Sequence, residues 1–286
     1  MAEDLRQLPP SGHTRARGLV SSRRSGSRID AKTFAPPDSL ADVVESFWVG
    51  RWDLPDHDPH VTELLGDPCV HVVAERGHSR VVGVWTRRWV NRLQGKGFVR
   101  AVKLRPGAVR AFFSCSASTL TDTLGPLDAL DGAPRSDAFE ATILDPESDA
   151  EAFAHFRDIL EGLRRHDDDD EMHHAIAIAE QLRDPSLCTV NGLAPSAGMN
   201  IRALQRLFKN HVGAPPKTLL CRVRLQEAAL AIEKGEVPNF ARLAVDLGYT
   251  DQAHLSRDFR IAVGVTPKEL QLRFNNDNNN NNNNNA

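Results

Sequence analysis

Hydrophobic residues follow two different rhythms along this chain. Between residues 34 and 145, short runs of β-branched and aromatic residues are separated by Gly, Pro and Asp, a pattern typical of an antiparallel sheet or small barrel. The clearest runs are FWVGRWDL (47–54), CVHVVAE (69–75), RVVGVW (80–85) and FVRAVKLRPG (98–107). Beyond residue 176, strand signals are nearly absent and apolar residues recur at helical spacing. The pattern predicts a two-domain α+β protein, with a β-rich N-terminal domain and an all-α C-terminal domain.

Between these regions lies an amphipathic segment, EAFAHFRDILEGLRR (151–165). Its apolar residues are three and four apart, which places them on one helical face. That face either packs on the first domain or forms a dimer interface, because the two uses look the same in sequence. The acidic run HDDDDEMHH (166–174) is suited to a hinge.

The two ends of the chain show no apolar periodicity. Arg, Ser, Gly and Pro dominate the N-terminal end, which predicts a disordered basic tail, and a run of Asn at the C-terminal end is a low-complexity tail or a placeholder. The predicted organisation is a tail (1–33), a β-rich domain (34–150), an amphipathic helix and acidic linker (151–175), a helical domain (176–274) and the Asn-rich end (275–286).

One short segment occurs twice in the helical region. LQRLFKNHVGAPPKTL (204–219) and LSRDFRIAVGVTPKEL (255–270) carry the same residue at half of their paired positions. The pairing extends upstream, where Leu193-Ala194 and Gly198 correspond to Leu243-Ala244 and Gly248, with one residue fewer in the first turn. Each copy therefore predicts a short helix, a Gly-containing turn and a second helix.

The ends of these helices carry the expected capping residues. Asn200, and Thr250 or Asp251, occupy N-cap positions. Gly213 and Gly264 are suited to the C-termini, and prolines 216 and 267 can open the helices that follow. In each copy the first, shorter helix supports the second, and we call it the support helix. The support helix of the first copy contains Gly192, Pro195 and Ser196, which are poor helix formers, so we expect it to be less rigid than that of the second copy.

Two-helix repeats also build solenoids, but those need about three or more repeats to be stable. Two helix-turn-helix units joined by a long helix (roughly 216–234) have a different use. They can place two recognition helices in successive major-groove segments of B-DNA, about 34 Å apart.

Residues 193–228 and 243–270 closely resemble the DNA-binding domain of AraC/XylS-type transcription regulators, and GYTDQAHLSRDFR followed by GVTPKEL carries the stronger signature. The resemblance implies a regulator, usually an activator, that binds promoter DNA and acts with RNA polymerase. It implies base contacts by Arg202, Gln205, Arg206, Gln252, His254, Ser256 and Arg257. Phosphate contacts are expected from Lys209, Lys217, Arg260 and Lys268. Each of these side chains could instead belong to an ordinary solvated helix face.

In that family the N-terminal domain senses a small molecule, mediates dimerisation, or does both, often with a cupin-like barrel. Residues 47–113 also look similar to an uncharacterised domain attached to such regulators. The residues suited to an apolar pocket with polar anchors are Trp48, Arg51, Trp52, His71, Trp85, Lys103 and Arg105. The alternative is that these aromatics are simply core.

Composition narrows the remaining classes. A net charge of -3 requires any DNA contact to rest on a local basic patch. No apolar run is long enough to cross a bilayer, and four scattered cysteines without a CxxC pair are typical of reduced thiols in a cytoplasm. Nucleophile-elbow, P-loop, HExxH and dinucleotide motifs are missing, so we expect no enzyme, cofactor or metal. The rival classes are a ligand-independent architectural protein and a DNA-targeted enzyme such as a methyl acceptor.

Overall fold

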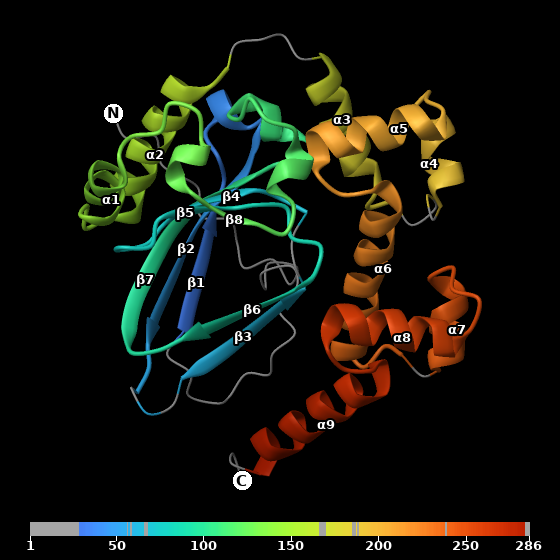
Figure 1. Ribbon diagram of the computed structural model, residues 1–286. Coiled ribbons are helices and arrows are strands. Elements are labelled where there is room, and N and C mark those ends of the chain that lie inside the picture. The colour runs from blue at the N-terminus through green and yellow to red at the C-terminus, as the bar shows by residue number, and fades with distance from the viewer. Residues whose placement is uncertain are drawn as a thin grey trace.

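A computed structural model describes residues 29–55, 57, 59–65, 68–165, 170–184, 187, 189–237 and 239–283 of the chain (Figure 1). The N-terminal part is a six-stranded antiparallel sheet in the order β1-β2-β7-β4-β5-β8, with a separate ribbon of β3 and β6. The strands are β1 (Ile29–Phe34), β2 (Val44–Asp53), β3 (His60–Leu65), β4 (His71–Ala74), β5 (Arg80–Val82), β6 (Arg88–Leu93), β7 (Lys96–Leu104) and β8 (Leu124–Pro126). The predicted β-rich domain is confirmed, and within the described residues β1 and β8 form open edges of the sheet, as opposed to a closed barrel.

Strand β1 corrects one prediction. Disorder was expected up to residue 33, but Ile29–Phe34 pairs along its whole length with β2. The ladder hydrogen bonds of β2 order this segment despite its polar sequence, because an edge position requires only one buried side. The rest of the predicted tail, residues 1–28, lies outside the described residues.

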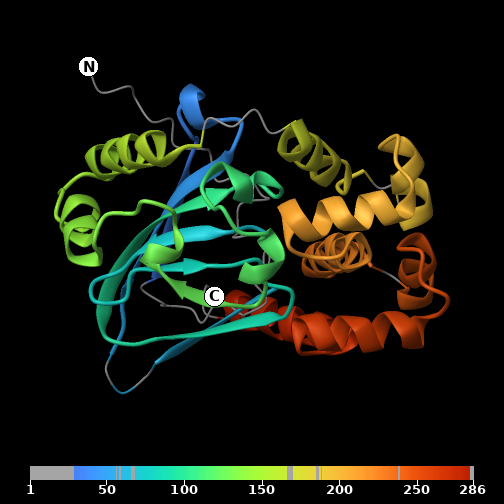
Figure 2. The ribbon, with the colours of Figure 1, turned by 45° about the horizontal axis from the view of Figure 1, so that its top comes forward.

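Two helices cover one face of the sheet, as Figure 2 shows: α1 (Ser136–Leu144) and α2 (Asp149–Leu163). Phe153 and Phe156 of α2 are fully buried, and their rings lie 5.2 and 6.1 Å from that of Phe47 on β2. The apolar stripe of residues 151–165 therefore packs within the domain. Of the two uses that the sequence left open, the structure favours packing on the first domain. The buried stripe is not available for a dimer interface.

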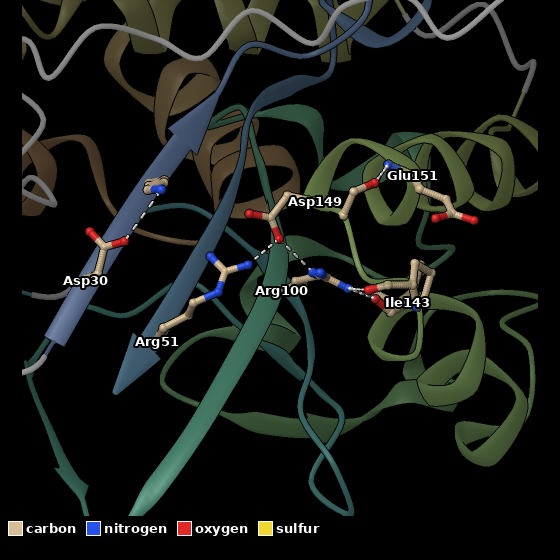
Figure 3. A network of polar contacts seen from close by, with 9 residues as sticks. Asp30, Arg51, Arg100, Ile143, Asp149 and Glu151 are labelled. Atoms are coloured by element: carbon tan, nitrogen blue, oxygen red, sulfur yellow. Dashed lines mark hydrogen bonds and ion pairs between the residues drawn. The ribbon is translucent and has the colours of Figure 1, made fainter. Parts of the chain in front are cut away.

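A buried arginine fastens the α1–α2 connection to the sheet (Figure 3). Arg100 of β7, 2% exposed, donates to the backbone oxygens of Ile143 (2.8 Å) and Pro146 (2.9 Å), and its Nε donates to Asp149 Oδ1 (3.0 Å). Arg51 of β2 reaches the same carboxylate oxygen at 2.6 Å. Buried charges are tolerated when they are paired and hydrogen-bonded in this way.

The C-terminal part is helical. Its elements are α3 (Asp170–Gln181), α4 (Val190–Ser196), α5 (Ile201–Leu207), a π-helical turn η5 (Phe208–Val212), α6 (Pro216–Glu233), α7 (Phe240–Asp246), α8 (Gln252–Val263) and α9 (Pro267–Asn283). The two helix-turn-helix units are α4–α5 and α7–α8, and α6 is the predicted long helix that joins them. The all-α prediction for this region is confirmed.

The acidic run and the Asn-rich end both enter helices. Residues 170–174 of the predicted hinge form the first turns of α3, while 166–169 lie outside the described residues. Helix α9 continues to Asn283, through the Asn run that the sequence indicates as a low-complexity tail or a placeholder. The N-terminus of α9 is stabilised by a capping box. The Thr266 amide donates to the Glu269 carboxylate, and the Glu269 amide donates to the Thr266 hydroxyl. Nothing in the described packing explains why the asparagines continue the helix.

The apolar core does not divide where the sequence pattern changes. One cluster runs from the sheet and its helices into α3, α4, α5 and the start of α6, and it includes Phe112, Ile178 and Phe208. A second cluster holds the end of α6 with α7, α8 and α9. The first helix-turn-helix unit thus shares its core with the β domain, and the second has its own. The domain bounds drawn from sequence remain a prediction.

The ion pair between Arg164 and Asp42 makes part of the stability of the β domain depend on pH. Arg164 donates to both carboxylate oxygens of Asp42, at 3.1 Å for Oδ1, and His173 lies 3.8 Å away. Burial acts to raise the pKa of Asp42, but the hydrogen bond and charge of Arg164 outweigh it, so the pKa lies below its ordinary value.

We therefore expect Asp42→Asn to lower the free energy of unfolding at neutral pH by about 0.5–1 kcal/mol, because the pair is partly exposed. A depressed pKa stabilises the fold above the ordinary aspartate value of about 4, and this contribution is lost as pH falls through the lower folded value. Urea unfolding at several pH values should show wild type and variant converging in acid. The exposed Asp128→Asn is the control, and a constant difference across pH would contradict the assignment.

Candidate nucleic-acid interface

The first helix-turn-helix unit is capped as its sequence predicts. Asn200 accepts a hydrogen bond from the Ala203 amide at 2.9 Å and begins α5. Thr189 does the same for α4, accepting from Gly192 at 3.1 Å. Helix α4 forms with Pro195 inside it, and its last turn is closed by Gly198 at φ +65°. Its seven residues equal those of α7, so the weaker helix formers do not shorten the first support helix.

Helix α5 presents a polar face opposite its core side. Leu204, Leu207 and Phe208 are buried. The predicted base-contacting residues Arg202, Gln205 and Arg206 are all exposed. In the described part of the chain neither arginine forms an ion pair or hydrogen bond, so both guanidinium groups are available to an anionic ligand.

The first recognition helix ends differently from the second. After Leu207 the backbone widens into the π-helical turn η5, which ends at Gly213 with φ +86°. Helix α8 runs regularly for twelve residues to Gly264 at φ +88°. The predicted glycine C-caps and the prolines that open α6 and α9 are confirmed in both copies. The π turn was not predicted, because a single widened turn leaves no signal in apolar spacing.

The second unit places its recognition helix with a longer turn. Asp251, one of the two residues predicted for this cap, accepts from the His254 amide at 2.7 Å and begins α8. Five residues separate α7 from α8, against four between α4 and α5, which accounts for the extra residue in the second copy. Asn239 caps α7 by accepting from Ala241 and Arg242.

The exposed face of α8 carries most of the predicted contacts. Gln252, His254 and Arg257 are exposed, while Leu255, Phe259 and Val263 form the buried side. Ser256 is only partly exposed, because it lies nearer to the buried side of the helix. Ala253 is exposed beside Gln252 and can offer an apolar contact. Contact with bases remains a prediction for all of these residues.

The residues expected at phosphates are also accessible. Lys209, Lys217, Arg260 and Lys268 are exposed. Among the residues that the structure describes, only Arg260 of these four lies near a carboxylate, that of Glu269 at 4.0 Å. Lys209 follows α5, and Lys268 follows α8, so the basic groups flank both recognition helices. A chain of net charge -3 requires such local basic groups for nucleic-acid binding, and their role at phosphates stays a prediction.

A polar cluster behind α8 escaped the sequence analysis. Cys221 of α6 lies 3.1 Å from the Tyr249 hydroxyl and 3.8 Å from Asp258 Oδ2. The Tyr249 ring also packs edge-on against His254 at 5.2 Å, and His254 lies 3.7 Å from Asp258. Burial raises the pKa of the Cys221 thiol, which keeps it protonated at neutral pH. These contacts connect the linker helix to a predicted base-contacting side chain, and such long-range pairs leave no spacing signal.

The residues predicted for a ligand pocket do not all lie in one place. Trp48, Trp52, His71 and Lys103 share the sheet face away from α1 and α2, where Trp48 donates to His71 Nδ1 at 3.2 Å. Lys103 pairs there with Glu45 at 3.4 Å. Arg51 lies on the opposite face with Asp149, and Arg105 binds Ala41 O and Glu180.

Trp85 follows β5, and its backbone oxygen accepts from Arg222 of α6. The structure therefore brings together four of the seven residues. The cluster of Val73, Val99 and Ala101 under Trp48 and Trp52 shows that these indoles also serve as partial core.

Comparison with known proteins gives two family matches. Residues 193–273 match a helix-turn-helix domain, and residues 32–126 match a domain of unknown function (DUF6597). The second match agrees with the resemblance of the β-rich region to an uncharacterised domain. No helix in the described part is both long and apolar enough to span a membrane.

Individual relatives share part of the chain. The HTH-type transcriptional activator RhaS of Pectobacterium atrosepticum is 31% identical over 152 residues, which are 51% of this chain and 52% of that protein. A probable bifunctional transcriptional activator/DNA repair enzyme AlkA of Mycobacterium tuberculosis is 36% identical over 84 residues, 29% of this chain and 17% of that one. The chain thus spans about half the length, or less, of these curated relatives.

Among solved structures, ToxT from Vibrio cholerae aligns over 87% of this chain and 98% of its own, with a TM-score of 0.38 and 12% identity. The assignment rests instead on the C-terminal domain. Its two helix-turn-helix units, its linker helix and its match over residues 193–273 agree with the quoted sequence signature. Residues 193–273 therefore form a helix-turn-helix domain of the type found in AraC/XylS regulators, which the chain resembles through this domain.

Proposed function

We propose that this protein is a sequence-specific DNA-binding transcription regulator. The observation that carries the proposal is the pair of recognition helices, α5 and α8, each with an exposed polar face and a buried apolar one. Helix α6 joins the two units, so a single chain presents both (Figure 1). Two such helices suit successive major-groove segments of one duplex.

The chemistry of the two faces supports base reading. Arg202, Arg206 and Arg257 can each donate two hydrogen bonds to guanine O6 and N7, and Gln205 and Gln252 match the adenine edge. The flanking lysines add phosphate contacts, which supply affinity and register without sequence choice. The likeness to RhaS, a transcriptional activator, supports the role of an activator. Action at promoters with RNA polymerase, in the cytoplasm, is part of the proposal.

We further propose that the β domain senses a small molecule. The sheet face that bears Trp48, His71 and Lys103 combines aromatic surface with a cationic group, a combination suited to an apolar ligand with a polar end. Dimerisation is proposed for the same domain, through a surface other than the apolar stripe of α2.

Selection of bound DNA from a random pool tests the function directly. We expect the full chain to enrich one motif containing two base clusters about one helical turn apart. A variant carrying Arg202→Ala and Arg257→Ala should retain the fold and lose the enrichment. Repeating the selection with a metabolite extract tests the sensing role, since an effector should change the yield or the motif.

The alternatives predict different results. An architectural protein would bind DNA without enriching a motif, and its affinity would not respond to the extract. A chain that binds no DNA even at low salt, where phosphate contacts are strongest, would contradict the proposal itself.

A further inference from the structure

The duplicated Val-Gly turns that end the two recognition helices meet the same piece of the β domain. This piece is residues 84–88, which comprise most of the connection after β5 and the first residue of β6, and we call it the coupling segment. In Figure 1 the ribbon of β3 and β6 lies beside α8, and both strands contact that helix. At the other end of the coupling segment, Val84 lies at the Gly213 turn that ends the first recognition helix. The coupling segment therefore passes from one helix-turn-helix unit to the other.

Its first residue touches the first unit. A Cβ placed on Gly213 would lie 3.0 Å from Val84 Cγ2 and 2.8 Å from the backbone oxygen of Ala117. The turn is also held by hydrogen bonds: Thr121 donates to Gly213 O at 2.5 Å, and Ser116 donates to Lys209 O at 3.1 Å. The end of the first recognition helix is thus fixed against the β domain.

Its last residue touches the second unit. A Cβ placed on Gly264 would lie only 2.1 Å from a guanidinium nitrogen of Arg88, so the Arg88 side chain lies directly against this turn. Glycine is favoured here by a left-handed φ of +88°, and the guanidinium of Arg88 fills the space beside it. Between the two contacts, Arg222 of the linker helix, 5% exposed, donates to Trp85 O at 2.9 Å.

The coupling segment is itself held firmly. Asp122 accepts from the Thr86 amide and hydroxyl, both at 2.7 Å, and its amide donates to Val84 O at 2.8 Å. Arg87 adds an ion pair to the same carboxylate at 3.3 Å. Asp122 has a positive φ of 53°, a conformation that costs energy for any residue with a Cβ and persists where the surroundings impose it.

We propose that residues 84–88 position the two DNA-reading helices relative to each other, and so determine the separation of base clusters that the protein selects. The inference rests on the proposed DNA-binding function and deepens it. Both contacts lie at the C-terminal turns of the recognition helices, away from the exposed residues at Arg202 and Arg257. The segment therefore acts on geometry and leaves the reading faces uncovered. Arg88, within the segment, and Thr121, which binds the same Gly213 turn as Val84 from outside the segment, are positioning residues.

Two variants each release one unit. Arg88→Ala frees the Gly264 turn, and Thr121→Val frees the Gly213 turn. Arg92→Ala is the matched control, because Arg92 is exposed on the same face of β6 as Arg88 and its replacement removes the same charge. The full-length chain is used throughout.

The first measurement needs no DNA. Spin labels on non-natural residues at positions 191 of α4 and 245 of α7, both exposed, report the distance between the units. We expect a narrow distribution in wild type and in Arg92→Ala, and a broader one in Arg88→Ala and Thr121→Val. If both release variants stay as narrow as wild type, the proposal is overturned whatever DNA does.

The second measurement uses the selected motif with its two base clusters moved apart or together by about one or two base pairs. Wild type and Arg92→Ala should prefer one spacing, and the release variants should lose that preference by about fivefold while still reading the bases. An unchanged spacing profile in both release variants would overturn the proposal. Failure of wild type to select any motif would refute the proposed function, whereas the distance measurement would still decide the role of the segment.

Discussion

Replacing Arg100 with alanine is expected to lower the free energy of unfolding by about 3–5 kcal/mol, the largest effect of any single change considered for this fold. Arg100 is 2% exposed and holds two backbone oxygens and the Asp149 carboxylate at once. Its loss leaves the buried oxygen of Ile143 and the partly buried oxygen of Pro146 without their donor, and a buried group left in this way costs about 1–3 kcal/mol. The cavity left by the side chain adds to this cost.

Urea unfolding followed by tryptophan fluorescence measures the effect, because all four tryptophans lie in the β domain. Arg51→Ala is the matched control: it removes the same charge from the same carboxylate, but its side chain is 38% exposed and we expect about 1 kcal/mol or less. Equal losses in the two variants would show that the buried backbone contacts of Arg100 contribute little.

The second large effect concerns recognition. Arg257→Ala should weaken binding to the selected DNA by about 1–3 kcal/mol and relax the preference at one base position, because a bidentate contact to guanine would be lost. Arg257 is exposed on α8 and, in the described part, forms no ion pair that would have to be broken first.

Quantitative binding to the selected motif and to single-base variants provides the measurement. Lys268→Ala is the comparison, since loss of a phosphate contact should weaken all sequences alike and reduce the salt dependence. An Arg257→Ala protein that keeps the wild-type ranking of base variants would remove this residue from the base-reading set.

The local elements were predictable because they depend on neighbours in the chain. Asn200 and Asp251 begin their helices, Gly213 and Gly264 end them, and Pro216 opens the linker helix, all as their residue types require. The alternation of apolar and polar residues predicted strands β2 and β7, and the repeated segments 204–219 and 255–270 predicted two helix-turn-helix units. Each of these depends on interactions within a few residues, which a sequence displays directly.

The candidate site was predictable in part for the same reason. Helical spacing separates Leu255 and Phe259 from Gln252 and Arg257, and the structure exposes the second pair. The residues of the proposed ligand pocket were harder to predict from the sequence. Arg51 and Trp52 are adjacent in the chain, yet they lie on opposite faces of β2, because side chains alternate along a strand. Ser256 sits closer to the buried side of α8 than a reading residue should, because one step along a helix turns the side chain by about a quarter of a circle.

By itself, the sequence determined the two recognition helices, their caps, the helix that joins them and the strand-rich domain before them. Only the tertiary structure decided how these parts are coupled. In the folded molecule the first helix-turn-helix unit shares the core of the β domain, and the apolar stripe of α2 is buried within that domain. Residues 84–88 lie between Gly213 and Gly264. The reason is physical: caps and periodicity are satisfied within a few residues. The contact of Arg88 with Gly264 joins positions far apart in the chain, and its energy exists only once the whole molecule has folded.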